Sequence, residues 1–114
     1  MPHFIVDCSQ GILRLRSEEE ILERLHRAVH ATGLFEASDI KVRVNAFRTY
    51  AVGGGKDDFI HVFSHIMQGR TVAQRADLAK RIVGALADLF PAIDRIATNV
   101  AEFEQATYCN RGML

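Results

Sequence analysis

Along the chain, the spacing between apolar residues changes between that of a strand and that of a helix. These changes predict the order of the secondary-structure elements. The β-branched and aromatic run FIVDC near the amino terminus predicts a short buried strand over residues 3–8. Apolar positions then recur at helical spacing, and the Ser-x-x-Glu pattern that begins at Ser17 is typical of a capping box. Because Gly33 suits a left-handed stop, we expect a helix over residues 17–32.

The middle of the chain carries an alternating pattern that is typical of strands. Apolar and polar residues alternate from Asp39 to Tyr50, which predicts a strand with one face on a core. The sequence GGGKDD at residues 53–58 predicts a turn, and residues 59–67 resume a strand pattern. We therefore expect these two strands to form an antiparallel hairpin.

A second helix and a last strand complete the pattern. Thr71 opens another capping box, Thr-x-x-Gln, and apolar residues follow it at helical spacing until Pro91. Residues 93–104 predict a last strand, and residues 105–114 predict a loose tail. The interval from the capping residue to the next strand is 23 positions in both halves, from Ser17 to Ile40 and from Thr71 to Asp94.

These spacings indicate a single domain over residues 1–114 built from two similar halves, about 2–50 and 59–108. We expect an α/β (α+β) fold in which a duplicated β-α-β unit forms a four-stranded mixed sheet with both helices on one face. The helices are expected on the side of Ile40, Val42 and Val44. The opposite face then keeps apolar residues uncovered, and packing against other copies of the chain would cover them.

Composition narrows the class of protein. The 114 residues are 48% hydrophobic and 25% charged, as in folded globular proteins. Fourteen basic and fourteen acidic residues cancel, so no positive field favours nucleic acid as a partner, and no apolar stretch is long enough for a membrane span. Cys8 and Cys109 are too few for a disulfide framework, so we expect reduced thiols and a cytoplasmic location, with Cys8 serving only as packing.

The amino terminus offers a reactive group. Proline after the initiator Met1 is a context in which the methionine is usually removed, which would leave Pro2 with a free secondary amine. An α-amino group titrates near about 7.7–8.0, and burial beside cations favours its neutral form, so it could act as a general base. A second-position proline is also common at the start of a strand without any chemistry. Here no tail precedes the strand, so the nitrogen would lie at the end of the sheet.

Four short motifs give the chain a family resemblance. The segments are MPHFIV at residues 1–6, TGLF at 32–35, IKVRV at 40–44 and GRT at 69–71. With them the chain resembles the 5-carboxymethyl-2-hydroxymuconate isomerase family of the tautomerase superfamily, from Pro2 to about Tyr108. The resemblance implies a trimer of duplicated β-α-β units that needs no cofactor or metal. It also implies that Pro2 is the catalytic base, moving a proton between carbons of an unsaturated 2-hydroxy or 2-oxo carboxylic acid.

The resemblance makes three cations candidates for holding a small-molecule carboxylate substrate. Lys41 and Arg43 share one side of their predicted strand, and Arg70 precedes a helix cap whose amides also favour an anion. His3, beside the proline, either faces the substrate or lies on the surface. The better-known isomerases have Arg where this chain has Lys41, and Lys lacks the bidentate fork of Arg, so the substrate could differ.

Other groups of residues, and other functions, have weaker support in the sequence. His61 and His65 are about 13 Å apart in a strand, and His26 and His30 have no third ligand, so no metal site is expected. The alternatives to the isomerase are a phenylpyruvate-like tautomerase, a dehalogenase-type hydration that uses the same proline, and a non-enzymatic homotrimer that serves as a binding or assembly module.

Overall fold

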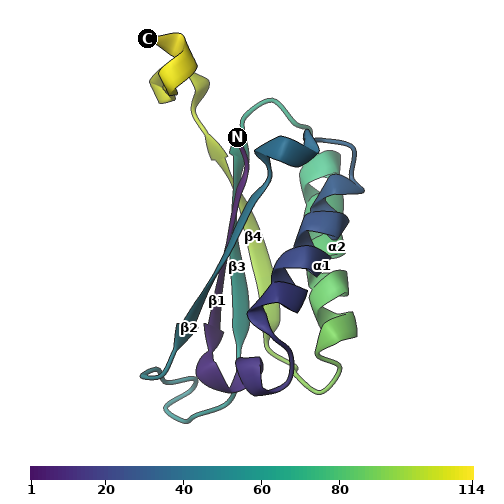
Figure 1. The fold of residues 1–114 in the computed structure, drawn as a ribbon, viewed down its shortest axis with the longest axis vertical. Coiled ribbons are helices and arrows are strands. Elements are labelled where there is room, and N and C mark those ends of the chain that lie inside the picture. The colour runs from purple at the N-terminus through teal and green to yellow at the C-terminus, as the bar shows by residue number, and fades with distance from the viewer.

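A computed structural model of residues 1–114 shows one sheet covered on one face by two helices (Figure 1). This two-layer arrangement confirms the predicted fold class. The strands and long helices are β1 (His3–Ser9), α1 (Glu18–His30), β2 (Lys41–Phe47), β3 (Ile60–Met67), α2 (Val72–Leu89) and β4 (Ile96–Phe103).

The sheet is mixed, with strand order β2-β1-β3-β4. The two halves each form a parallel pair, β1 with β2 and β3 with β4, and the halves join through antiparallel pairing of β1 with β3. The predicted hairpin between residues 39–50 and 59–67 is therefore wrong, because β1 lies between these strands. The glycine turn is present, but it closes on itself through two hydrogen bonds between the backbones of Val52 and Gly55, at 2.9 and 3.0 Å.

Several boundaries differ from the predicted ones, and α1 ends at His30 instead of residue 32. The second strand does not begin until Lys41 because Ala37–Asp39 forms a 3-10 turn, and the last strand begins at Ile96 instead of residue 93. The expected loose tail contains two further 3-10 turns and projects beyond the body of the protein (Figure 1).

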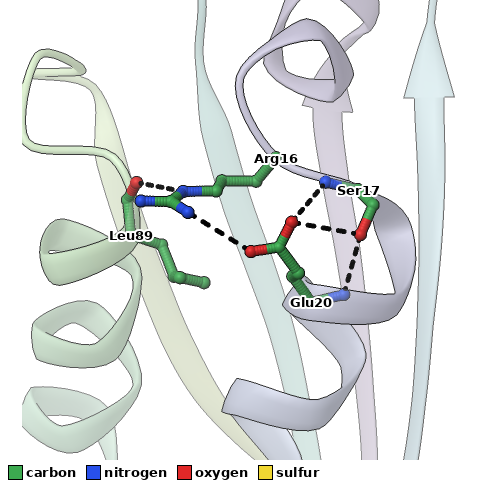
Figure 2. A network of polar contacts seen from close by, with 4 residues as sticks. All are labelled: Arg16, Ser17, Glu20 and Leu89. Atoms are coloured by element: carbon green, nitrogen blue, oxygen red, sulfur yellow. Dashed lines mark hydrogen bonds and ion pairs between the residues drawn. The ribbon is translucent and has the colours of Figure 1, made fainter.

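Both predicted capping boxes are present, and the first also links the two halves. The Glu20 amide donates to the Ser17 hydroxyl at 3.2 Å, and the Glu20 carboxylate accepts from the Ser17 amide at 3.4 Å (Figure 2). Arg16 pairs with the same carboxylate at 3.3 Å and donates to the carbonyl of Leu89 at 3.4 Å. The start of α1 is thereby attached to the end of α2.

The core lies between the sheet and the helices. Alternate β1 residues Phe4, Val6 and Cys8 are fully buried there, and Val42 and Val44 pack against them, so the helices cover the predicted side of the sheet. Burial raises the pKa of the Cys8 thiol to about 11, which keeps it protonated and agrees with a packing role. The buried cluster is completed by Ile12, Ile21, Leu25, Val29, Ile60, Val62, Ile66, Leu78, Ile82, Leu86 and Phe90.

The other face of the sheet has no second layer. It carries Ile5 on β1 and two large aromatic residues, Phe47 at 40% and Phe63 at 39% exposure. Polar pairs lie among them, including His61 and Asn99 at 2.7 Å. The predicted uncovered face is thus present, and its apolar residues are open to solvent in the monomer. No helix has the length and apolar character required to cross a membrane.

Candidate active site

Pro2 lies where β1 begins and is buried. Its carbonyl accepts a hydrogen bond from the Lys41 amide at 3.2 Å, so the β1–β2 ladder begins at this residue. A cavity of about 240 Å³ opens beside it. The walls of this cavity, called the Pro2 cavity below, are Met1, Pro2, Gly33, Leu34, Phe35, Glu36, Asp39 and Arg70.

The loop after α1 shapes this cavity. Gly33 adopts a positive φ of 74°, the left-handed conformation that the sequence predicted for the helix stop. The Thr32 hydroxyl donates to the carbonyl of Val29 at 2.6 Å and accepts from the Leu34 amide at 3.2 Å. The loop is therefore fixed by its own short contacts, and it presents Leu34 and Phe35 to the start of β1.

Arg70 reaches this loop from the other half of the chain. One of its terminal N–H groups donates to the Leu34 carbonyl, and its guanidinium carbon lies 5.2 Å from the centre of the Phe35 ring. It forms no salt bridge with an acid. A charged group held against a cavity wall without a carboxylate partner is suited to bind an anion.

The amino-terminal amine lies in an environment that favours its neutral form. Its pKa is lowered from the ordinary value chiefly by partial burial, and the positive charges of Lys41 and Arg70 lower it further. Asp39 opposes this shift, because its carboxylate stabilises the ammonium form. This amine belongs to Met1, the residue directly before Pro2. The Lys41 ammonium donates to the backbone carbonyl of Asp39 at 2.9 Å.

His3 and Arg43 point to the other side of the sheet. The guanidinium Nη1 of Arg43 lies 3.1 Å from Nδ1 of His3. Both line a separate cavity of about 270 Å³ on the uncovered face, together with Ile5, His65 and Phe103. Within one chain, the structure therefore divides the predicted site residues into two groups, with Pro2 and Arg70 in one cavity and His3 and Arg43 in another.

Two features of the site were not predicted from the sequence. Asp39, in the 3-10 turn before β2, is a carboxylate that acts on the terminal amine, and Leu34 and Phe35 form a cavity wall. The motif TGLF marked the loop, but nothing in the sequence indicated that Arg70 would be stacked on it. No group of three or more His, Cys, Asp or Glu side chains could hold a metal ion.

The largest cavity, about 630 Å³, lies at the opposite end of the sheet and contains none of the predicted site residues. Asp57, Asp58 and Asp94 line it, with Arg95 as the only basic residue. Its three acids outnumber one base, whereas in the Pro2 cavity Glu36 and Asp39 are balanced by Arg70 and the terminal amine, so the smaller Pro2 cavity is the better candidate for a carboxylate.

Comparisons with known proteins relate the chain to a family of isomerases. A sequence model of the 5-carboxymethyl-2-hydroxymuconate isomerase family matches residues 2–104. A 5-carboxymethyl-2-hydroxymuconate Delta-isomerase of Escherichia coli is 27% identical over 95 residues, covering 82% of this chain and 75% of the relative.

Solved structures share the fold. A 5-carboxymethyl-2-hydroxymuconate isomerase from Deinococcus radiodurans R1 superposes with a TM-score of 0.84 at 22% identity, covering 96% of this chain and 88% of the other. A fused 4-OT asymmetric trimer superposes with a TM-score of 0.82 at 15% identity, covering 96% and 93%.

Proposed function

The chain belongs to the 5-carboxymethyl-2-hydroxymuconate isomerase family and is thus an isomerase, and we propose that its general base is the amino-terminal nitrogen of Pro2, freed by removal of Met1. The proposed substrate is an unsaturated 2-hydroxy or 2-oxo carboxylic acid that resembles 5-carboxymethyl-2-hydroxymuconate. The observation that carries the proposal is the burial of Pro2 at a cavity that Arg70 also lines. The amine of the adjacent Met1 has its pKa lowered by partial burial and by the charges of Lys41 and Arg70, and a nitrogen freed at Pro2 would lie next to that position.

The proposed reaction moves one proton and needs no cofactor. The neutral Pro2 nitrogen takes a proton from a carbon beside the conjugated system, and the electrons of the broken C–H bond pass into a dienolate. Arg70, on the wall of the cavity, stabilises the negative charge that develops and binds the carboxylate, and the nearby charge of Lys41 adds to the positive field. The protonated nitrogen then returns the proton to a distant carbon of the same molecule, so the base is regenerated.

We propose that the working form is a homotrimer. The uncovered face carries Ile5, Phe47 and Phe63, and burial of these side chains would favour association. The fused 4-OT proteins with this fold are described as trimers. His3 and Arg43 lie on this face, so packing of the copies would enclose their cavity. Size measurement should give three chains per particle, and a stable monomer would contradict the proposal.

Turnover of Pro2 variants tests the mechanism. Intact-mass measurement should show a chain that lacks Met1, and Pro2→Ala should lower kcat/KM by about 10²–10⁴-fold, the usual contribution of a general base. Loss of dienol absorbance in the ultraviolet provides the assay. Pro91→Ala is the matched control, because Pro91 is the other proline of the chain and lies exposed after α2.

The outcomes separate the proposed isomerase from its rivals. An active chain that retains Met1 would exclude the amine as the base, because the Pro2 nitrogen is then an amide. Pro2→Ala keeps a primary amine, so unchanged turnover in this variant would exclude a requirement for the secondary amine of proline. Faster conversion of a phenylpyruvate-like enol, or hydration of a haloacrylate, would assign the same nitrogen to a different substrate. The engaged Lys41 ammonium, 2.9 Å from the Asp39 carbonyl, is the observation that favours testing these substrates.

A further inference from the structure

We propose that His3 is a positioning residue for Arg43, and that its Nδ1 atom accepts a hydrogen bond that fixes the direction of the guanidinium. The inference rests on the proposed function and adds to it that Arg43, on the uncovered face, also binds a carboxylate of the substrate. It gives His3 a role that differs from direct contact with substrate.

The backbone brings the two side chains together from adjacent strands. In the parallel register His3 lies opposite Lys41, and Ile5 lies opposite Arg43. The Arg43 side chain reaches back along the sheet, and its Nη1 lies 3.1 Å from Nδ1 of His3. This is the one side-chain hydrogen bond that Arg43 makes, and Arg43 has no salt bridge with an acid.

The chemistry of the pair determines which group donates. A guanidinium can only donate, because it has five N–H groups and no acceptor. His3 must then accept at Nδ1, so the ring is neutral and carries its proton on Nε2. One guanidinium N–H is engaged by His3, and the others remain free for a planar, bidentate contact with a carboxylate.

The surroundings of His3 favour this neutral form. Its pKa is lowered chiefly by partial burial, and then by Arg43 and Lys41 of β2, by the terminal amine and by His65 of β3. From β4 only the uncharged Phe103 approaches, with its ring 6.0 Å from the His3 ring and at 89° to it. No carboxylate is among the groups that shift the pKa of His3, so nothing near it stabilises an imidazolium.

The same contacts make the pair sensitive to acid. When His3 is protonated, Nδ1 becomes a donor and the ring becomes a cation beside the guanidinium. The hydrogen bond is lost and Arg43 is repelled. We therefore expect Arg43 to be held above the lowered pKa of His3 and released below it, so that KM rises on the acid side while kcat changes less.

Two substitutions at His3 distinguish positioning from a general structural role. In His3→Asn the amide oxygen takes the place of Nδ1 and still accepts from Arg43. This variant should therefore retain most of the wild-type affinity for substrate, but it should lose the rise in KM at acid pH. In His3→Leu the acceptor is absent, and KM should rise about tenfold. In an Arg43→Ala background His3→Leu should cause no further loss, because the two residues act as one unit.

Nuclear magnetic resonance of the imidazole nitrogens provides a readout that does not depend on turnover. Wild-type protein at neutral pH should show Nδ1 of His3 unprotonated and Nε2 protonated, and the pKa of His3 should rise in Arg43→Ala, which removes a nearby cation. A proton on Nδ1, or an equal loss from His3→Leu with and without Arg43, would overturn the inference. If instead a chain that retains Met1 keeps full activity while the tautomer is as expected, the proposed base is wrong and the His3–Arg43 contact stands.

Discussion

Replacing Arg70 with leucine should destabilise the protein, in addition to any effect on substrate binding. Arg70 precedes α2 and joins the two halves of the chain at the Pro2 cavity. The substitution removes a hydrogen bond to the Leu34 carbonyl and a contact with the Phe35 ring, whose centre lies 5.2 Å from the guanidinium carbon. Both partners belong to the loop that forms one wall of the cavity.

The size of the effect follows from these two contacts. A hydrogen bond from a charged donor contributes about 1.5–3 kcal/mol, and a cation over an aromatic ring contributes about 0.5–2 kcal/mol. Because Arg70 is half-buried, the lower part of each range applies, and we expect a loss of about 2–3 kcal/mol in the free energy of unfolding. Arg70→Lys keeps the charge but not the planar group, so its loss should be smaller.

Urea unfolding followed by circular dichroism, at one fixed protein concentration, measures the change. Arg81→Leu is the matched control, because Arg81 also lies on α2 but pairs on the surface with Asp77 at 2.9 Å. Such an exposed pair contributes about 0.3–0.5 kcal/mol. If Arg70→Leu costs no more than Arg81→Leu, the contacts with Leu34 and Phe35 do not stabilise the loop.

Three further predictions concern other parts of the molecule. Ser9 is fully buried, donates to Asp58 at 2.7 Å and accepts from the Phe59 amide at 3.1 Å. Ser9→Ala should therefore lower the free energy of unfolding by about 2–4 kcal/mol in the same urea assay. A smaller loss than that of Ser38→Ala, at an exposed position, would refute this prediction. In a chain that retains Met1, Asp39→Asn should lower the pKa of the Met1 amine further, since the carboxylate stabilises the ammonium. The pH dependence of amine acylation, followed by mass spectrometry, should then shift to lower pH, and a shift to higher pH would contradict the assigned charge effect. Phe63→Lys places a charge on the uncovered face and should reduce the particle size in sedimentation, whereas an unchanged trimer would place the interface elsewhere.

Patterns within short stretches of the sequence predicted the helices and strands. The pairing between strands that are distant in the sequence could not be predicted in this way. Both capping boxes were correctly placed, because a cap depends only on residues three positions apart. The hairpin was wrong because a glycine turn does not specify which strands become neighbours, and the α1 crossover sets β2 beside the outer edge of β1.

The same limit applies to the candidate site. Lys41 and Arg43 both lie on β2, where the alternating pattern predicted a strand, but that pattern did not show that Arg70 would line the cavity beside Pro2. That placement depends on the contact between Arg70 and the loop at Leu34, which brings together residues 36 positions apart.

The antiparallel pairing of β1 and β3 has a consequence for how a duplicated chain can use its two halves. The halves begin at opposite ends of the sheet, so the corner that corresponds to Pro2 in the second half is the acidic cavity at Asp57 and Asp58. The nitrogens there are locked in peptide linkages and have no basic lone pair. Under the proposed mechanism, only the first unit can therefore supply a free amino-terminal nitrogen, and the second unit would support the fold.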